Sequence, residues 1–568
     1  MAKKKEIKAR GKAPKHEKRP KYKQAFAKIK EIVGEDFLIQ DKDEIEKRSK
    51  TLLPFERRPL AYIYPGSKEE VSQIVKIADE HKLPLWPASR AKNWGYGSGT
   101  PAQDRTAILS LERLNKILEV NEEMAYCVIE PGVTFRQLHE YLEEKKLPLW
   151  IDCTDGPAQG SIVGNSLERG VGETNYGDHF GNICGMEVLL PDGSMIQTGG
   201  GPIDRFKSWN IHKWSIGPYI EGLFSQGNYG IVLKAGIWLM PKPKHFASVV
   251  FELKKEESLP QMIDALRRLQ LNGALKSKIH IINDVVTFAV VSDSPRELLE
   301  GASYLIYERR QQLQKRFRIS PWSFAAGLYG TKDQIKANMR LIRKELGHLG
   351  KLQFIGKHKL YLIKKMLSIL KKRSGNKFWK SLLDFVSYEI VRKPFGLIEN
   401  FPHVYDIEMG YPSDYFVKHG YYKYYGPKPA DDDIDPARDE CGLIWHGPLV
   451  PLKGSEVKSF LDLVRPYYEK YELDLSIALM VANERTVIAL LSIFYDKQSP
   501  EETKRAKLLY FELGKVIQDA GYQAYRTSTI YMDRIFSNVP SYLSFLNKIK
   551  KAIAPNNIIA PGQYGIDA

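Results

Sequence analysis

The chain has 568 residues, of which 43% are hydrophobic and 27% are charged, and its formal net charge is +17. This length and composition predict a soluble globular protein of two or three domains, and no apolar run reaches the roughly 20 residues that span a bilayer. The four cysteines show no CxxC or CxxH spacing. That spacing argues against a disulfide framework or a structural zinc site and favours a reducing compartment.

The N-terminal residues 1–39 are predicted to form a basic, flexible arm. Residues 1–30 hold thirteen lysines and arginines against two glutamates. The arm either only aids solubility or serves as an electrostatic handle for an acidic partner, a membrane surface or nucleic acid. It lacks the apolar core of a secretory signal, so a cytoplasmic location is expected. No RRM, zinc-finger or KH pattern is present, and nucleic-acid binding is not expected to be the main function.

Helical and strand patterns alternate along residues 60–240. Helical spacing over Lys68–His81 leads into a short apolar run at 83–87, and residues 135–146 repeat this scheme. Two strands with a turn between them are predicted over 186–198, because Pro-Asp-Gly-Ser separates two apolar runs. A further strand at 230–239 precedes two prolines.

Long amphipathic stretches then become frequent, at 259–271, 295–316 and 332–349. Strand-like runs are predicted at 288–291 and 487–494, and 475–495 is interpreted as two strands and a turn rather than a membrane span. Residues 415–439, rich in Tyr, Lys, Pro and Asp, are predicted to form a long surface loop. These patterns predict an α+β fold with a first domain over 40–245, a second domain inserted at 246–510 and a C-terminal segment, 511–568, that returns to the first.

Two glycine-rich segments carry the chemistry. The first, PASRAKNWGYGSG at 87–99, follows a predicted strand, and successive N–H groups in such a loop form an anion-binding nest to which Arg90 and Lys92 add charge. It suits a pyrophosphate, although alone it equally suits an ordinary turn, and it lacks the GxGxxG of a Rossmann nicotinamide site. The second, at 156–187, holds eight glycines interleaved with apolar residues. It is predicted to wrap, buried, around a flat polar ligand.

Six segments give the most specific signal. In chain order they are PASRAKNWGYGSG, GSIVGNSLERGVGETNYGDHF, GPYIEGLFSQGNYGIVLKAGIWLMP, CGLIWHGPLVPLKG, YRTSTIYMD and NNIIAPGQYGID. From about residue 55 onward the chain resembles the vanillyl-alcohol oxidase and p-cresol methylhydroxylase family of FAD-linked oxidoreductases. The resemblance implies a PCMH-type FAD-binding domain of two α+β subdomains and an inserted α+β cap domain over the isoalloxazine ring.

The resemblance also implies the residues of the cofactor site, and no metal is expected. The implied cofactor-binding residues are Pro87, Ala88, Ser89, Arg90, Ala91, Lys92, Asn93, Gly95, Tyr96, Ser161, Gly164, Asn165, Arg169, Gly170, Gly177, His179, Gly185, Glu187, Gly230, Ile231, Val232, Arg526 and Gln563.

The family's usual reaction is oxidation of para-substituted phenols. The phenol binds as phenolate, a hydride passes from the benzylic carbon to flavin N5, and water adds to the resulting quinone methide. Tyr96 and Tyr525 match the phenol-binding tyrosines, and Arg526 matches the arginine beside the reactive end of the flavin, where it stabilises negative charge. Asp155 lies near the family's catalytic carboxylate, which takes up a proton or activates water. Outside these motifs the tyrosines would be interpreted as core residues. Asp155 can equally be interpreted as a turn residue before Gly156 and Pro157.

Three departures from the family pattern bear on the cofactor link and the substrate. Leu443 stands where histidine-linked members carry their histidine, with His446 three positions away, so non-covalent FAD is predicted and His446 is interpreted as a pocket-lining or structural residue. The nearest candidates for a tyrosine link are Tyr421, Tyr422, Tyr424 and Tyr425. Gln563 replaces a cation, which weakens phenolate binding. Ala478 and Val487 replace a carboxylate and a histidine, so the substrate pocket, predicted at His446, Ala478, Met480 and Val487, is more apolar.

Three functions remain open at this point. The first is oxidation of a 4-alkylphenol or aromatic alcohol, with O2 or a cytochrome c-like carrier as electron acceptor. The second is a flavoenzyme acting on a non-phenolic alcohol or hydroxy acid, and the third is a basic binding protein with a vestigial flavin fold. The expected partners are a small aromatic substrate, one of those acceptors and a second copy of the chain in a homodimer or higher oligomer.

Overall fold

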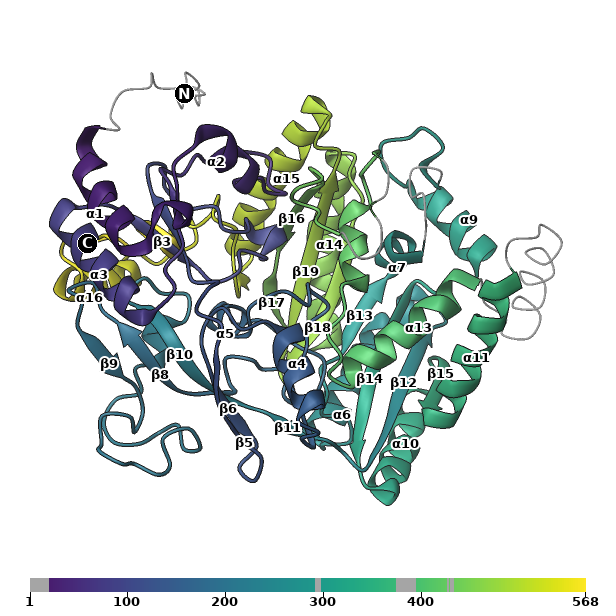
Figure 1. Ribbon diagram of the computed structural model, residues 1–568. Coiled ribbons are helices and arrows are strands. Elements are labelled where there is room, and N and C mark those ends of the chain that lie inside the picture. Colours follow the sequence, from purple (N-terminus) through teal and green to yellow (C-terminus); the bar gives the residue numbers. More distant parts are fainter. Residues whose placement is uncertain (1–19, 292–297, 374–394, 427–428, 430–433) are drawn as a thin grey trace.

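The computed structural model describes residues 20–291, 298–373, 395–426, 429 and 434–568 (Figure 1). The prediction of a flexible arm is wrong for residues 20–39. They form η1 (Pro20–Tyr22), α1 (Lys23–Val33), η2 (Glu35–Phe37) and β1 (Leu38–Ile39). Helix α1 buries Ala25, Phe26, Ile29 and Val33, which recur at helical spacing, and packs on α3 (Lys68–His81). Residues 1–19 lie outside the described part.

Two sheets form the part of the molecule drawn in purple and blue in Figure 1. The first has the order β1-β2-β4-β3, with β2, β4 and β3 parallel. The second, β5-β6-β10-β8-β9, is antiparallel, and its β8–β9 pair confirms the predicted hairpin. The bounds are β2 (Tyr62–Ile63), β3 (Leu85–Ala88), β4 (Ala107–Ser110), β5 (Ile117–Asn121), β6 (Tyr126–Ile129), β8 (Ile183–Leu189), β9 (Met195–Gln197) and β10 (Ile231–Trp238).

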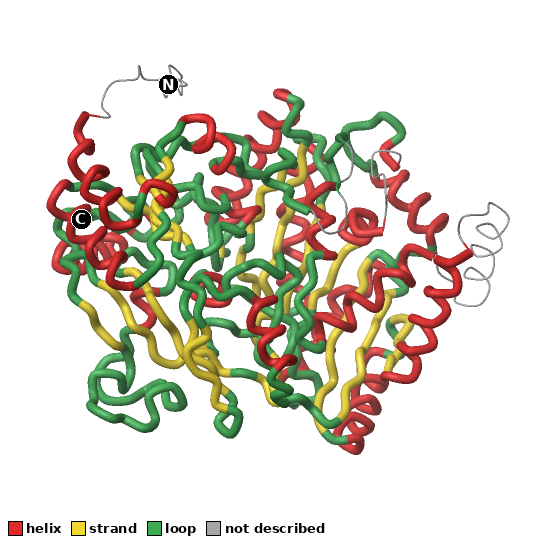
Figure 2. Tube along the Cα trace, viewed as in Figure 1, coloured by secondary structure: helices red, strands yellow, loops and turns green. Residues whose placement is uncertain are grey.

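Short elements join these sheets to the rest of the chain. They are α2 (Lys42–Arg48), η3 (Trp94–Tyr96), α4 (Phe135–Glu144), α5 (Ile162–Leu167), η4 (Glu221–Phe224) and the strand pair β7 (Leu149–Trp150) and β11 (Met240–Pro241). Figure 2 shows that the middle of the molecule, between the first two sheets and the large third sheet, consists mostly of loops and turns.

The third sheet has nine strands in the order β15-β12-β14-β13-β18-β19-β17-β20, and β16 also pairs with β19. The bounds are β12 (His245–Leu253), β13 (His280–Asn283), β14 (Trp322–Gly330), β15 (Gly350–Gly356), β16 (Gly442–His446), β17 (Pro448–Pro451), β18 (Ser476–Asn483), β19 (Thr486–Tyr495) and β20 (Gln523–Ala524). Strands β18 and β19 confirm the interpretation of 475–495 as two strands. The C-terminal segment contributes β20 here, and its Ile559 also bridges Leu85 of β3.

Helices cover both faces of the nine-stranded sheet (Figure 1). Alternate residues such as Val249, Phe251 and Leu491 pack under the helices of one face, because side chains alternate along a strand. Those helices are α6 (Leu259–Leu271), α10 (Lys332–Leu346), α14 (Gly454–Lys470) and α15 (Pro500–Asp519). The opposite face carries α7 (Asp284–Val291), α11 (Lys357–Arg373) and α13 (Phe395–Glu408). The remaining helices are η5 (Glu256–Ser258), α9 (Tyr307–Phe317), η7 (Tyr415–Tyr421), α16 (Pro540–Ile553) and η8 (Gln563–Gly565).

Two predictions of local structure are wrong. Residues 288–291, predicted as a strand, belong to α7, because a short apolar run does not distinguish a buried helix from a strand and Asn283 accepts a hydrogen bond from the Val286 N–H at the helix start. Residues 415–439, predicted as a surface loop, begin with η7, and Tyr421 and Tyr422 are buried in a cluster with Leu443. Residues 427–428 and 430–433 of that segment lie outside the described part.

In the described ranges no helix combines the length and the apolar composition that crossing a membrane requires.

Candidate functional site

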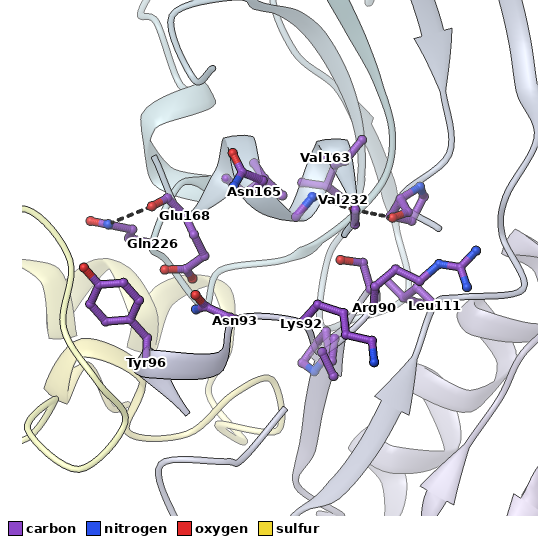
Figure 3. Close-up of a pocket in the computed structure, with 18 of the residues that line it drawn as sticks. Arg90, Lys92, Asn93, Tyr96, Leu111, Val163, Asn165, Glu168, Gln226 and Val232 are labelled. Atoms are coloured by element: carbon purple, nitrogen blue, oxygen red, sulfur yellow. Dashed lines mark hydrogen bonds between the residues drawn. The ribbon is translucent and has the colours of Figure 1, made fainter. Parts of the chain in front are cut away.

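A cavity of about 240 Å³ lies between the loop after β3 and helix α5. In Figure 3, Val163 and Asn165 of α5 lie above it with Glu168 and Gln226, and the loop residues from Arg90 to Tyr96 lie below. The loop turns sharply at Ala91, whose φ is 52°. The two walls approach closely at Gly164, where a Cβ would lie 2.2 Å from Ser89 Oγ. The glycine therefore permits the close packing that shapes this cavity.

Several buried polar atoms on this cavity have no hydrogen-bond partner among the described residues. They are the Tyr96 hydroxyl, Ser98 Oγ, Thr529 Oγ1 and Arg526 Nε. Buried donors and acceptors in native proteins are nearly always paired. A polar ligand of considerable length, held by these groups and by the backbone of the 87–93 loop, fits this arrangement.

Most of the predicted cofactor residues line this cavity. Those that do are Pro87, Ala88, Ser89, Arg90, Ala91, Lys92, Asn93, Tyr96, Ser161, Gly164, Asn165, Gly230, Ile231, Val232, Arg526 and Gln563. The two predicted cations are partly engaged elsewhere, because Arg90 Nε donates to the Gly132 carbonyl at 2.9 Å and Lys92 Nζ lies 3.0 Å from Asp435. The backbone N–H groups of the loop, rather than a free lysine, are thus the clearer anion-binding feature.

Seven predicted cofactor residues do not line this cavity. They are Gly95, Arg169, Gly170, Gly177, His179, Gly185 and Glu187. Gly95 and Gly170 are needed for packing, since a Cβ would lie 2.3 Å from the Trp445 ring and 1.9 Å from Asn165 Oδ1 respectively. Arg169 Nε donates to Ser225 at 3.1 Å, and a Cβ at Gly177 would meet Lys278.

The two residues on β8 lie on structural contacts instead. A Cβ at Gly185 would lie 2.5 Å from the Trp209 ring, and Glu187 pairs with Lys234 at 3.2 Å and with Lys68 at 3.5 Å. Sequence position within a glycine-rich motif therefore does not separate glycines that face the cavity from those that pack behind it.

His179 belongs to a buried network that fixes the second glycine-rich loop. Its ring nitrogens lie 2.6 Å from Asn165 Oδ1 and 3.1 Å from Asp152 Oδ1. Asp152 also accepts hydrogen bonds from the backbone N–H groups of Glu173 and Thr174. Burial alone would raise the pKa of Asp152, but these hydrogen bonds outweigh it and hold the pKa below its usual value. Sequence reasoning missed Asp152, which precedes the loop that it organises.

Tyr96, Tyr525 and Arg526 meet at the end of the first cavity. The Arg526 guanidinium lies 4.1 Å from the centre of the Tyr96 ring and 5.5 Å from that of Tyr525. The Tyr525 N–H donates to the Gly447 carbonyl at 3.0 Å, and a Cβ at Gly447 would lie 2.7 Å from the Tyr525 ring and 3.1 Å from the Tyr96 hydroxyl. This glycine lets both tyrosines converge.

The electrostatics of this cluster favour an anion beside it. Burial raises the pKa of Tyr96 well above its usual value, so its hydroxyl is a proton donor at neutral pH. Burial opposes the charge of Arg526, but Tyr525, Tyr96 and Glu168 outweigh burial and raise its pKa, so the guanidinium stays charged. Two phenol donors around a fixed cation can stabilise a negatively charged oxygen.

Glu168 and Tyr564 are site residues that sequence reasoning missed. Glu168 lines the first cavity, and its carboxylate accepts a hydrogen bond from the Tyr564 hydroxyl at 3.0 Å. Burial raises the pKa of Glu168, partly countered by Arg526. The neighbouring Gln226 side chain donates to the Tyr525 carbonyl at 2.9 Å. All three residues lie in the motif segments of the sequence, but their contacts join distant parts of the chain, which no single motif reveals.

A second cavity of about 590 Å³ joins the first at Tyr96 and Arg526 and extends over one face of the nine-stranded sheet. Alternate strand residues form its floor, among them Val250, Ala325, Ile282, Leu490 and Trp445. Helices α7, α11 and α13 form its opposite wall. The site thus consists of an elongated polar cavity and a larger, mainly apolar one that share the Tyr96–Arg526 junction.

Two of the four residues predicted for the substrate pocket face the second cavity, whereas the prediction that His446 and Val487 line a pocket is wrong. Ala478 and Met480 line the second cavity. Val487 is fully buried on the opposite face of β19, since Leu490 and Ser492 occupy the cavity face. On β16 the cavity face belongs to Trp445.

His446 instead packs against the rings of Tyr510 and Tyr531. Burial lowers the pKa of His446 to about 4, so the ring is neutral at physiological pH. A one-residue offset along a strand moves a side chain to the other face of the sheet, which explains both errors.

Asp155 lines the second cavity, and the ionisable residues Glu173, His280 and Glu408 are among those that line it with Asp155. Glu173 and His280 lie 3.5 Å apart, and Glu408 projects from α13. Burial and the nearby Asp155 raise the pKa of Glu173 well above its usual value, and burial raises that of Glu408 to about 8. Burial lowers the pKa of His280. At neutral pH this region can therefore both donate and accept protons.

None of the tyrosines considered for a flavin link lines either cavity. The Tyr421 hydroxyl donates to Asp439 at 2.6 Å and accepts a hydrogen bond from the Asp435 N–H at 3.1 Å, so its contacts are structural. Tyr422 is buried in the cluster with Leu443.

The comparisons with known proteins first define the class. Residues 59–199 match the model of an FAD binding domain, and this range contains both glycine-rich loops. Together with the polar cavity, the match defines a flavoprotein, and a mainly apolar chamber adjoins that cavity at Tyr96 and Arg526.

Full-length relatives then define the family. The chain is 31% identical to the flavoprotein subunit of 4-cresol dehydrogenase (hydroxylating) of Pseudomonas putida, over 98% of this chain and 97% of that one. It is 33% identical to 1'-carboxy-chondrochloren decarboxylase of Chondromyces crocatus, over 95% and 96%. The structure of p-cresol methylhydroxylase with substrate bound matches with a TM-score of 0.84 at 30% identity, over 98% of both chains. The chain belongs to the p-cresol methylhydroxylase-type family of FAD-dependent oxidoreductases.

Proposed function

We propose that this flavoenzyme oxidises a para-substituted phenol or a related aromatic alcohol at the benzylic carbon. The observation that carries the proposal is the convergence of Tyr96, Tyr525 and Arg526 where the polar and apolar cavities join. Two hydroxyl donors and a buried cation suit a phenolate oxygen, and the apolar chamber beside them suits an aromatic ring. The relatives named for 4-cresol and p-cresol support the same substrate class.

In the proposed reaction, Tyr96, Tyr525 and Arg526 bind the phenol oxygen and stabilise its negative charge as the phenolic proton leaves. When bound, FAD would supply the acceptor for a hydride, that is, one proton with two electrons, from the benzylic carbon. The substrate becomes a para-quinone methide. Water then adds its oxygen to the benzylic carbon, and Asp155 accepts the proton that the water releases. Holding the ring in one orientation supplies part of the rate enhancement.

The electron acceptor and the assembly state are part of this proposal. We expect O2 or a cytochrome c-like carrier to reoxidise the flavin, and a homodimer or higher oligomer as the working form. FAD is expected to be bound non-covalently, and release of free FAD from acid-precipitated protein would support this. Yellow colour retained in the precipitate would contradict it.

An anaerobic flavin-bleaching screen tests the proposed function. The purified protein is mixed with 4-alkylphenols, vanillyl-type alcohols and aliphatic alcohols while the flavin absorbance is followed. Bleaching by phenols, and its strong reduction in Tyr525→Phe, is the expected result. Fast recovery in air would indicate an oxidase, and slow recovery a dehydrogenase with a separate carrier. Failure of every phenol to bleach the flavin would overturn the proposal.

One observation favours a second candidate, a non-phenolic alcohol or hydroxy acid. Gln563 lines the first cavity where the phenol oxidisers of this family are expected to carry a cation, so one source of phenolate stabilisation is missing. In that case aliphatic alcohols or hydroxy acids would bleach the flavin and Tyr525→Phe would have little effect.

A further inference from the structure

The second cavity is long rather than round. Seven strands contribute to its floor, in the order β16, β19, β18, β13, β14, β12 and β15. Six strand spacings of about 4.8 Å give a path of about 29 Å across the sheet. The phenol site lies at the β16 end, because Trp445 of β16 is 5.5 Å from the Tyr96 ring, measured between ring centres. A simple cresol would leave most of this path empty.

The middle of the path is apolar, with side chains such as Ile282, Val286, Ala325, Ala478 and Met480. His280 on β13 lies three strand spacings, about 14 Å, from the Trp445 end. Beside His280 the wall of the cavity becomes polar, because Glu173 from the second glycine-rich loop lies close to His280 and Glu408 projects from α13.

The acids in this part of the cavity are buried and incompletely hydrogen-bonded. Glu408 is only 2% exposed, and neither of its carboxyl oxygens makes a hydrogen bond of good geometry to the described residues, although the nearby Ser248 hydroxyl lowers its pKa slightly. Glu173 is 7% exposed, and its Oε1 likewise has no hydrogen-bond partner there. A buried carboxyl group without a partner costs free energy, so these positions are expected to be satisfied by a ligand.

In the described part of the chain, the two nearby lysines donate hydrogen bonds to other groups and form no ion pair with Glu173 or Glu408. Lys359 Nζ donates to Gln353 Oε1 at 3.3 Å on the outer strand β15, and Lys278 Nζ donates to the Ala482 carbonyl. Asp155, Glu173 and Glu408 face the same cavity. Burial keeps Glu173 and Glu408 protonated at neutral pH when no cation is bound, and a basic nitrogen beside them can take up such a proton and form an ion pair with the resulting carboxylate.

We infer that the para substituent of the substrate is a long, mainly apolar chain carrying a basic nitrogen, and that Glu173 and Glu408 bind this nitrogen as a cation. The inference rests on the proposed function, because the phenol end of the substrate is taken to lie at Tyr96, Tyr525 and Arg526. The inferred substrates are larger molecules than simple alkylphenols. They account both for the length of the cavity and for its incompletely hydrogen-bonded acids.

Matched compounds test the inference. They are 4-alkylphenols of increasing chain length that end in a methyl, an ammonium or a carboxylate group. Half-saturation is measured in anaerobic flavin reduction, and affinity is measured by calorimetry on the fully reduced enzyme, which cannot turn over. The ammonium series is expected to bind about tenfold to a hundredfold more tightly than the methyl series, with the gain appearing only once the chain is long enough to reach Glu173. The carboxylate series is expected to bind most weakly.

Variants assign the effect to particular residues. Glu408→Gln is expected to remove most of the ammonium advantage while 4-ethylphenol reduces the flavin as in the wild type. Ser323→Ala is the matched control, because Ser323 lies on the same cavity floor and carries no charge. It is expected to keep the advantage. If Glu408→Gln fails to fold, Glu173→Gln and Glu408→Asp provide the same comparison, with the aspartate expected to retain part of the gain.

The outcomes separate the two proposals. If no phenol reduces the flavin, the proposed function fails. If simple phenols reduce it but ammonium-ended chains show no advantage, or carboxylate-ended chains bind best, only the inferred substrate class is wrong. An ammonium advantage that persists in both glutamine variants would also overturn the assignment to Glu173 and Glu408.

Discussion

The two cavities of this protein are built in contrasting ways. The polar cavity is formed by short, consecutive stretches such as 87–93, with small residues where the walls approach. The apolar cavity is formed by every second residue of seven strands, from Val250 to Phe494, and by helices from other parts of the chain. Buried polar groups line most of the first cavity, whereas in the second the buried carboxyl groups without a good hydrogen bond are those of Glu173 and Glu408. The polar cavity thus depends on local stretches of sequence, whereas the apolar cavity depends on the whole sheet.

This difference suggests different constraints on the two cavities. A loop that places backbone N–H groups around a ligand depends on its own conformation, so its sequence is restricted at each position. A sheet face can change its lining by substitution at alternate positions without altering its backbone. A common cofactor site can therefore be combined with different substrate chambers.

The largest effect is expected where the cavities join. Arg526→Ala removes the cation that contacts both tyrosines, and flavin reduction by a 4-alkylphenol should slow by about a hundredfold to a thousandfold. Arg526→Lys restores charge without the planar guanidinium and should recover only part of the rate. Stopped-flow reduction measures both. An unchanged rate in Arg526→Ala would show that the junction does not serve the substrate.

The next effect concerns the loop that supports the polar cavity. A Cβ at position 172 would lie 1.5 Å from Asp152 Oδ1 and 2.6 Å from His179 Nε2. Gly172→Ala should therefore destabilise the protein by about 3 kcal/mol and lower its FAD content. Gly222→Ala is the control, since nothing lies within 4 Å of its Cβ position. Thermal unfolding and the ratio of flavin to protein absorbance test the pair, and equal behaviour of the two variants would contradict the packing argument.

A substitution at Glu408 in the apolar cavity is expected to stabilise the protein, whereas Gly172→Ala destabilises it. Glu408 holds its proton up to a pKa of about 8 in the folded protein, whereas an unfolded chain releases it near pH 4.3. The folded state therefore loses stability as pH rises between these two values and loses nothing below the lower one. Glu408→Gln should raise the unfolding free energy by about 4 kcal/mol at pH 7 and by almost nothing near pH 4. A gain that is equal at both pH values would contradict the assignment of this buried acid.

The smallest effect is expected at Lys92. Its ammonium pairs with Asp435 across a partly exposed contact, so Lys92→Gln should change FAD affinity by less than about tenfold and stability by less than about 1 kcal/mol. The double variant with Asp435→Asn should behave like either single variant. A large loss of FAD affinity in Lys92→Gln alone would instead indicate that Lys92 contacts the pyrophosphate, as the sequence predicted.

The sequence by itself identified the family, the α+β fold, both glycine-rich loops and the Tyr96, Tyr525 and Arg526 cluster. These features were accessible because each motif is contiguous and its chemistry depends on neighbouring residues. The junction also unites residues far apart in sequence, but each lies in a motif whose role the family resemblance supplied.

Only the tertiary structure decided which residues line the substrate chamber and which lie behind it. Val487 and His446 were placed on the wrong face because the faces of a strand differ by one residue of register, and register depends on pairing with distant strands. Glu408 carries no sequence signal, since the position of α13 over the cavity depends on its packing against α11, α7 and β14. Burial, and with it the altered pKa and the missing partner, is a property of all the surrounding elements, which no local stretch of sequence contains.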